Sequence, residues 1–328
     1  MNKRSSVPLR SLSVADLGLS EYLPATSVNA GVPEFSLEPL DESDPILGQI
    51  RSALRDGFAG VIFVGPPGTS KSWYAAKAAM AIAEGDRERF RFVQFHPSFQ
   101  YEDFVEGYVP LAAGGFELVP KHLLSICEDA AFSGKVHVLV IDEISRCDAA
   151  RVFGEALTYL ETSKRGLRFF LSSGTEMSIP PNVVILATMN PWDRGVDDMD
   201  MALERRFAHI EMSPSSDILR QFLERNGFPA ERVQGIVCFF DAAQKAQNPL
   251  CHIGHAYFVN VKDENSLLRL WDMQLRHHFA RACRHDPDEF KRIESIWFQL
   301  VGRPSANPPG AEEVAVGDNL TGEQPQPR

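Results

Sequence analysis

Cysteine is scarce in this chain of 328 residues, and its positions are scattered. The five cysteines include no CxxC pair, the spacing typical of many zinc and redox sites. A small secreted protein held together by disulfides would carry more cysteines in a short chain. We therefore interpret these residues as reduced thiols of an intracellular protein. They are Cys127, Cys147, Cys238, Cys251 and Cys283.

Long hydrophobic runs and an excess of positive charge are also lacking. No apolar stretch approaches the roughly 20 residues that a membrane-spanning helix needs. The first residues are basic, but polar and acidic residues interrupt the stretch after them, which is not the pattern of a signal peptide. The formal net charge of −11 argues against non-specific binding of nucleic acid over the whole surface. These absences predict a cytoplasmic protein that makes no use of a membrane.

Residues 65–72 (GPPGTSKS) form the strongest motif in the chain. A short apolar run over 60–64 predicts a buried strand before it, and an alanine-rich stretch over 73–83 predicts a helix after it. In this context backbone N–H groups and the helix N-terminus bind phosphate oxygens. The residues expected to contact a nucleotide here are Gly65, Pro66, Pro67, Gly68, Thr69, Ser70, Lys71, Ser72 and Trp73.

Three positions of this loop have specific expectations. Lys71 is expected to reach the outer phosphates, and the hydroxyl of Ser72 is expected to hold Mg²⁺. Ser70 stands where the pattern GxxxxGK[ST] has its second glycine. A small polar residue fits that position only if the backbone there is not strained.

A second motif lies at residues 136–143 (VHVLVIDE), where an apolar strand ends in two acids. The carboxyl ends of parallel strands meet at the sheet edge where ligands bind. We expect Asp142 to complete the Mg²⁺ shell and Glu143 to polarise the attacking water. A strand that merely ends in exposed acids is the alternative, and the phosphate loop upstream argues against it.

Two further stretches provide candidates for catalysis. The apolar strand predicted over 183–188 leads to Asn190, whose amide can orient a water beside the terminal phosphate. Residues 200–207 (DMALERRF) place Arg205 and Arg206 after a short helix, where they form either a solvated surface or a finger that reaches a neighbour's nucleotide.

The order of predicted elements indicates a division into four parts. Residues 1–44 are an arm, 45–212 an α/β nucleotide-binding domain, 213–301 an all-helical domain and 302–328 a disordered tail rich in Pro, Gly and acids. Within the α/β domain we predict hairpins near 108–120 and 168–179, and one helix over 151–161.

Taken together, the motifs resemble the AAA+ nucleoside triphosphatases and, within them, the McrB-type motors of modification-dependent restriction systems. The resemblance covers roughly residues 45–295. It rests on GPPGTSKS, FVQFHPSFQYEDFVEGYVP, VLVIDEISR, ILATMNPWDRGVDDMDMALERRF and HIGHAYF. It implies an α/β fold, with the parallel-sheet sandwich of an AAA+ P-loop domain followed by a small helical lid domain.

The resemblance also implies roles for individual residues. Asn190 matches the sensor 1 position, and Arg205 and Arg206 match the region of the arginine finger, which completes the site of a neighbouring subunit. Arg146 and Arg194 match positions near the subunit interface. His255 falls in the sensor 2 region, where many relatives place an arginine, and is expected to contact the nucleotide.

For cofactors and partners, the resemblance implies ATP or GTP with Mg²⁺, and ATP is favoured here. Ser145 replaces a usual Asn, and Pro191-Trp192 replaces a usual Thr-Ala, so the GTP preference of McrB-type motors is not carried over. We expect a homo-oligomer, with a hexameric ring as the favoured form, and a separate effector such as a nuclease. Residues 1–40 are too short for the DNA-reading domain of the McrB type, so DNA is expected to be met only indirectly.

Three interpretations of function remain open on the sequence. The first, and favoured, is a ring-forming nucleoside triphosphatase motor that drives a partner. The second is a chaperone similar to the MoxR group, which remodels a client protein. The third is a scaffold that binds nucleotide without hydrolysing it, because Ser70 has impaired turnover.

Overall fold

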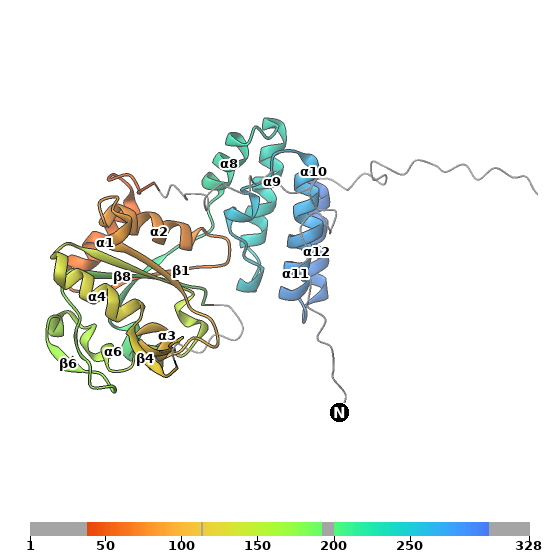
Figure 1. The fold of residues 1–328 in the computed structure, drawn as a ribbon. Coiled ribbons are helices and arrows are strands. Elements are labelled where there is room, and N and C mark those ends of the chain that lie inside the picture. Colours follow the sequence, from red (N-terminus) through yellow and green to blue (C-terminus); the bar gives the residue numbers. More distant parts are fainter. Residues whose placement is uncertain (1–37, 113, 192–199, 302–328) are drawn as a thin grey trace, which may run out of the picture. The chain divides into compact units, whose positions relative to one another are not determined.

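The computed structural model describes residues 38–112, 114–191 and 200–301 (Figure 1). With the exception of Glu38, all of them belong to one unit that spans 39–328. Most of the predicted arm, the predicted tail and Arg194 lie outside the described residues. The boundary between an α/β domain and a helical domain at residue 212 stays a proposal.

Five parallel strands form the central sheet, in the order β2-β5-β8-β1-β9. Their apolar, β-branched sequences suit strands that are covered on both faces. The parallel sheet predicted from the sequence is confirmed. The bounds are β1 Gly60–Val64, β2 Phe90–Gln94, β5 His137–Asp142, β8 Val183–Met189 and β9 Phe207–Glu211.

Helices cover both faces of this sheet (Figure 1). Helices α1 (Pro45–Arg55) and α2 (Lys71–Ile82) pack on one face, where Val61 and Phe63 of β1 point. Helix α4 (His122–Ser133) packs on the other face, toward which Ile62 points. Because neighbouring residues of a strand point to opposite faces, one strand contributes to both cores.

The single helix predicted over 151–161 is wrong. Two short helices, α5 (Ala149–Phe153) and α6 (Ala156–Tyr159), occupy this stretch and are separated at Gly154. Gly154 has a φ of +52°, and a Cβ atom there would lie 2.8 Å from the ring of Tyr101. The close approach of Tyr101, which begins the short helix α3 (Tyr101–Phe104), therefore requires glycine at this break.

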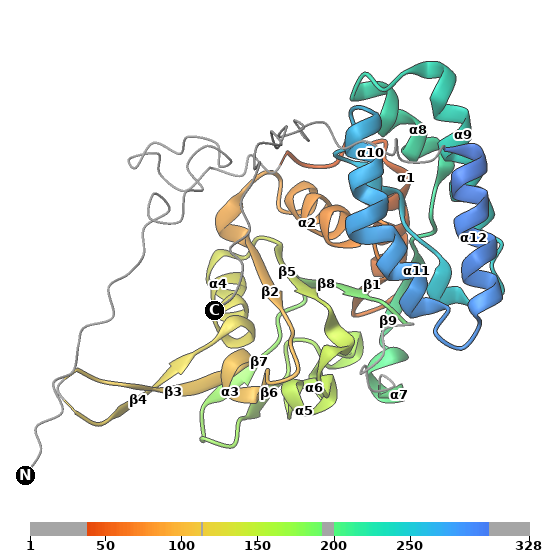
Figure 2. The ribbon, with the colours of Figure 1, turned by 90° about the vertical axis from the view of Figure 1, so that its right-hand side faces the viewer.

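Both predicted hairpins are present. Strands β3 (Glu106–Pro110) and β4 (Phe116–Pro120) pair antiparallel, as do β6 (Arg168–Phe170) and β7 (Glu176–Ser178). Figure 2 shows that the β3–β4 ribbon extends away from the central sheet. Its side chains are accordingly exposed at Tyr108 and Phe116.

Residues 216–301 are helical, as predicted. Within this region, a continuous helical stretch runs from α10 (Glu264–Leu270) through a π-helical turn (Trp271–Leu275) into α11 (Arg276–Ala282). Trp271 and Trp297 stack with their ring centroids 4.6 Å apart at the centre of this core. The other helices are α8 (Ser216–Arg225), α9 (Ala230–Gln244) and α12 (Pro287–Leu300), with 3-10 turns at Pro249–Cys251 and His255–Phe258.

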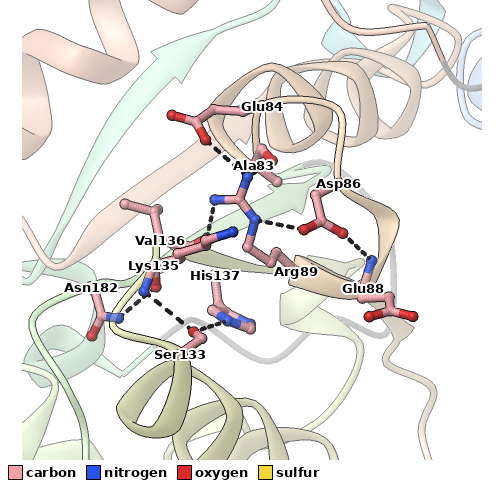
Figure 3. Close-up of polar contacts among 10 residues, drawn as sticks. All are labelled: Ala83, Glu84, Asp86, Glu88, Arg89, Ser133, Lys135, Val136, His137 and Asn182. Carbon is pink, nitrogen blue, oxygen red and sulfur yellow. Dashed lines mark hydrogen bonds and ion pairs between the residues drawn. The ribbon is translucent and has the colours of Figure 1, made fainter.

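Polar contacts hold the amino-terminal edge of the sheet, opposite the strand ends that carry the motifs (Figure 3). The guanidinium of Arg89 donates to the carbonyls of Ala83 and Val136 and to the carboxylate of Asp86. Asn182 Nδ2 donates to the carbonyl of Lys135 in the loop before β5. These contacts join the loops that lead into β2, β5 and β8, so this edge serves stability and leaves the carboxyl edge for chemistry.

Candidate nucleotide-binding site

A cavity of about 630 Å³ lies between the loop at residues 65–72 and the helical region. The loop is one wall, the strand ends of β5 and β8 contribute Glu143 and Asn190, and the helical region forms the opposite wall. The lining residues are Pro67, Gly68, Thr69, Ser70, Lys71, Ser72, Trp73, Glu143, Arg146, Asn190, Pro249, Leu250, Ala256, Tyr257, His278, Arg281 and Ala282. The structure thus brings most of the predicted site residues to one place.

The backbone of the loop is tightly constrained. A Cβ atom on Gly65 would lie 2.3 Å from the carbonyl oxygen of Met212, so only glycine fits there. Gly68 has a φ of +78°, which favours glycine. Ser70 has a φ of +63° and a ψ of +23°, in the left-handed region. The residue that replaces the expected glycine therefore adopts the conformation in which glycine would be unstrained.

Lys71 begins helix α2, and its side chain is buried under the loop. Its Nζ donates to the carbonyl oxygens of Gly65 and Pro66, both at 2.9 Å. Burial lowers the pKa of Lys71 from its usual 10.5, while the nearby carboxylates of Glu143 and Asp142 oppose that shift. The ammonium is thus held at the phosphate end of the cavity by the loop itself.

Asp142 lies where β5 ends and accepts two hydrogen bonds on the same oxygen, Oδ1. Ser72 Oγ donates at 2.6 Å and Thr188 Oγ1 donates at 2.7 Å. A hydroxyl beside a carboxylate is an oxygen donor set of the kind that holds Mg²⁺, which takes one or two protein ligands together with phosphates and water. Ser72 and Asp142 therefore fit the predicted Mg²⁺ site.

Glu143 follows Asp142 and lines the cavity. Its φ of +58° and ψ of +46° lie in the left-handed region, which is costly for a residue other than glycine. Two contacts hold it: its N–H donates to Thr188 Oγ1 at 3.0 Å, and its carboxylate pairs with Arg146 at 3.3 Å. The strained backbone turns this carboxylate toward the cavity.

The two arginines of the predicted finger region differ in exposure. Arg206 is buried, donates to the carbonyl of Ala202 and pairs with Glu161 at 3.6 Å. Arg205 is exposed at the end of α7 (Met201–Glu204). Neither lines the cavity that contains the phosphate loop. Of the two, only Arg205 is available to another molecule without disrupting the core.

His255 does not line the cavity, although it is predicted to contact nucleotide. It lies behind the phosphate loop, almost fully buried, with Nε2 3.4 Å from Ser70 Oγ. The backbone N–H groups of Gly254 and Ala256 donate to the carbonyls of Pro67 and Gly68, at 3.0 and 2.8 Å. A Cβ atom on Gly254 would lie 1.9 Å from Gly68 backbone atoms. Residues 254–256 of the helical region therefore bind the phosphate loop through hydrogen bonds between the two backbones.

Comparison with known proteins agrees with this geometry. The sequence profile of the AAA domain (dynein-related subfamily) matches residues 60–207, which contain β1, the phosphate loop, β5 and β8. Residues 60–207 are therefore similar to an AAA domain. No helix in the described ranges is long and apolar enough to cross a membrane.

Two restriction proteins are similar to this chain. The EcoKMcrB subunit of a type IV methyl-directed restriction enzyme of Escherichia coli K12 is 35% identical over 173 residues, which cover 50% of this chain and 38% of that protein. The YdiS component of the type II restriction enzyme BsuMI of Bacillus subtilis 168 is 26% identical over 221 residues, 54% of this chain and 63% of that one. The chain thus spans less than two thirds of either relative. The resemblance to the McrB group is confirmed.

One solved structure, of a protein from Cytophaga hutchinsonii proposed to be an ATPase, aligns with 76% of this chain and 90% of that one. The sequence identity is 16% and the TM-score 0.33, so the alignment adds nothing to the argument.

Several residues of the site are not predicted from the sequence. Thr188 is hydrogen-bonded to Asp142, which ends β5, and to Glu143, which follows it, but a threonine near the end of an apolar strand has no distinguishing pattern. Tyr257, His278 and Arg281 line the cavity from the helical region. HIGHAYF was a signal for the first of these, whereas nothing in the sequence of α11 indicated the other two.

Proposed function

We propose that this chain is a Mg²⁺-dependent nucleoside triphosphatase, with ATP favoured over GTP. The observation that carries the proposal is the hydrogen-bonded group of Ser72, Asp142, Thr188 and Glu143 at the phosphate end of the cavity. The AAA domain supports it, because that family binds and uses nucleotides.

In the proposed reaction, the loop amides and Lys71 hold the phosphates, with Asp142 and Ser72 as the Mg²⁺ ligands. When bound, Mg²⁺ supplies positive charge at the phosphate oxygens. Glu143 takes the proton of the attacking water and Asn190 orients that water. The Arg146 side chain lies beside Glu143, so its 3.3 Å ion pair must loosen for the carboxylate to act as a base.

We further propose that the chain acts as a homo-oligomer, with a hexameric ring as the expected form. The phosphoryl group in transfer carries charge that a cation supplied by a neighbour stabilises. Arg205 suits this role because it is exposed, whereas Arg206 is committed to the core. Hydrolysis by one chain would then depend on the next.

We propose that the chain works with a separate effector protein, a nuclease, and that it contacts DNA only through this effector. The support is that both restriction proteins are named as a subunit or a component of a larger enzyme. No observation in the site favours the chaperone alternative. The strained, left-handed backbone of Ser70 favours the non-hydrolysing scaffold, and a measurement of phosphate release distinguishes that scaffold from the proposed motor.

Light scattering with the Glu143→Gln variant tests assembly, because this variant is expected to bind ATP·Mg²⁺ without consuming it. The expected result is a monomer or small species without nucleotide and a discrete larger species with it. A mass that does not change with saturating ATP·Mg²⁺ or GTP·Mg²⁺ would contradict nucleotide-dependent assembly. Copurification from the source cell then separates a nuclease partner from a metal-binding client.

A further inference from the structure

Trp73, in the first turn of α2, differs in exposure from the other tryptophans that the structure describes. Trp271 and Trp297 are almost fully buried, at 1% and 0% exposure, whereas Trp73 is 50% exposed and lines the cavity. Tryptophan is highly buried on average in folded proteins. An indole left open in the wall of a binding cavity therefore offers its apolar surface to whatever the cavity binds.

Two side chains of the same helix fix the orientation of this indole. The Nζ atom of Lys77 lies over one face of the ring, 4.7 Å from its centroid. The rings of Trp73 and Tyr74 are nearly perpendicular, with their centroids 4.9 Å apart. Lys77 is not among the described residues that line the cavity, so the face that it covers lies away from the cavity. The opposite face of the indole is therefore the one open to a ligand.

The order of groups along a bound nucleotide indicates which part of it reaches Trp73. The amides of a phosphate loop hold the α- and β-phosphates, and the loop lysine, here Lys71, reaches the β- and γ-phosphates. Glu143 and Asn190, which line the cavity, act at the terminal phosphate in the proposed reaction. The ribose and the base extend from the α-phosphate, at the other end of the triphosphate. Trp73 follows the loop directly and is the residue next to that end.

Trp73 and Tyr257 supply the large aromatic rings in the described part of the cavity wall, and they differ in availability. The ring of Tyr257 packs on the phosphate loop, because a Cβ atom on Gly68 would lie only 2.8 Å from it. Trp73 instead has one open face and is held in place by its neighbours. A fixed aromatic ring with an open face is a platform on which bases stack, typically with a roughly 10- to 100-fold gain in affinity.

We propose that Trp73 is the base-stacking residue of this site: the open face of its indole stacks on the purine of the bound nucleotide. This inference rests on the proposed function, since it assumes that the cavity binds a nucleoside triphosphate. Stacking uses the face of the base and none of its edge groups, so it stabilises bound adenine and guanine alike. Trp73 thus supplies affinity for the base without selecting between ATP and GTP, and a preference for ATP depends on other contacts.

Binding measurements test the proposal in a background that does not turn over nucleotide. In full-length Glu143→Gln protein with Mg²⁺, titration calorimetry compares ATP, GTP and inorganic tripolyphosphate, which lacks ribose and base. Trp73→Ala should weaken the binding of ATP and of GTP by the same factor, roughly 10- to 100-fold, and leave that of tripolyphosphate unchanged. Trp73→Phe retains a ring and should keep most of the affinity. Phe132→Ala removes an exposed aromatic side chain of α4 outside the cavity, so this matched control should change none of the three affinities.

Indole fluorescence provides a readout that a purely structural role of Trp73 would not change. Addition of ATP should quench the emission, tripolyphosphate should not, and the quenching should be absent in Trp73→Phe.

Three results would overturn this inference alone. They are an ATP affinity that Trp73→Ala does not change, a loss confined to one of the two nucleotides, and an equal loss of tripolyphosphate binding. Failure of the Glu143→Gln protein to bind ATP, GTP and tripolyphosphate would instead refute the proposed function itself.

Discussion

The hydroxyl of Ser70 lies 3.4 Å from Nε2 of His255, and this contact joins the phosphate loop to the helical region. The N–H of Ser215 donates to Nδ1 of the same ring at 3.3 Å, so Nε2 carries the proton and donates to the serine. A glycine at position 70 would have no side chain for this bond. Ser70 thus combines a strained backbone with a contact that the usual glycine does not make.

We expect stability to separate the two properties of Ser70. Ser70→Gly relieves the left-handed backbone and loses the hydroxyl, whereas Ser70→Ala keeps the strain and also loses the hydroxyl. Ser70→Gly should therefore be the more stable variant, with a free energy of unfolding about 1 kcal/mol larger than that of Ser70→Ala. Urea unfolding at pH 7.5 measures the difference. Equal stability of the two variants would show that position 70 is not strained.

His255 should make the protein less stable in mild acid. Burial lowers the pKa of His255 to about 4, from a usual value of 6.5. Between these two values the unfolded chain binds a proton that the folded chain does not, so folding is progressively disfavoured as the pH falls from 6.5 toward 4. This group alone should lower the free energy of unfolding by about 2 kcal/mol between pH 7.5 and pH 5.

Comparison with a variant isolates that contribution. Urea midpoints of wild type and His255→Gln at both pH values should show a smaller loss of stability for the variant. His209→Gln, at an exposed position of β9, serves as the control and should lose stability in parallel with wild type. Parallel behaviour of His255→Gln would contradict the buried, neutral state of His255.

The fold is predictable from the sequence where a strand is buried on both faces and therefore consists of apolar residues. Strands β1, β5 and β8 are continuous apolar runs, and the acids after β5 lie at the sheet edge that the parallel arrangement dictates. The break at Gly154 was not predictable, because it depends on the ring of Tyr101, some 50 positions away in the chain. Local patterns do not encode such contacts.

Thr188 should matter more for turnover than for nucleotide binding. Its hydroxyl donates to Asp142 and accepts from the N–H of Glu143, and the side chain is buried. Thr188→Val keeps the shape but leaves the N–H of Glu143 unpaired and removes one of the two hydrogen bonds that Asp142 accepts, which should lower the free energy of unfolding by about 1–3 kcal/mol. Because Glu143 then loses one of its two restraints, phosphate release should fall further than nucleotide affinity does.

Thr188→Ser retains the hydroxyl and is the matched control. It should keep turnover close to that of wild type, as measured by phosphate release at saturating nucleotide. Turnover by Thr188→Val equal to that of Thr188→Ser would show that the hydroxyl does not position the two acids.

Arg205 and Arg206 should have different roles, with Arg205 required for turnover and Arg206 for stability. Arg205→Ala removes an exposed side chain, so the unfolding free energy should change by less than about 0.5 kcal/mol. Phosphate release should nevertheless fall by roughly 1000-fold, the usual effect of losing an arginine finger. Arg206→Ala should instead be destabilised, because it removes a buried partner of Glu161 and of the Ala202 carbonyl.

Mixing variants shows whether Arg205 acts on a neighbour. Arg205→Ala and Lys71→Ala are each expected to be inactive alone, but a mixed assembly contains some sites with an intact Lys71 and an intact neighbouring Arg205. Activity should therefore return on mixing. No recovery, in mixtures shown by light scattering to co-assemble, would place the action of Arg205 within its own chain.

The site shows the same limit of sequence reasoning as the fold. Lys71, Ser72, Asp142 and Glu143 were identified because their chemistry follows from a loop or a strand end. The resemblance assigns His255 to the sensor 2 region, but whether its side chain faces the nucleotide or the back of the loop depends on packing. The burial of Arg206 likewise involves an ion pair with Glu161, which lies outside the motif that contains the two arginines.

The central claim is that the phosphate loop and the acids after β5 form one catalytic site completed by a neighbour. Its most direct test is phosphate release by the full chain with ATP and with GTP, at rising protein concentration, beside Glu143→Gln. The account predicts release per chain that increases with protein concentration and falls roughly 100-fold or more in the variant. Wild-type release no greater than that of Glu143→Gln, at every concentration and with both nucleotides bound, would contradict it.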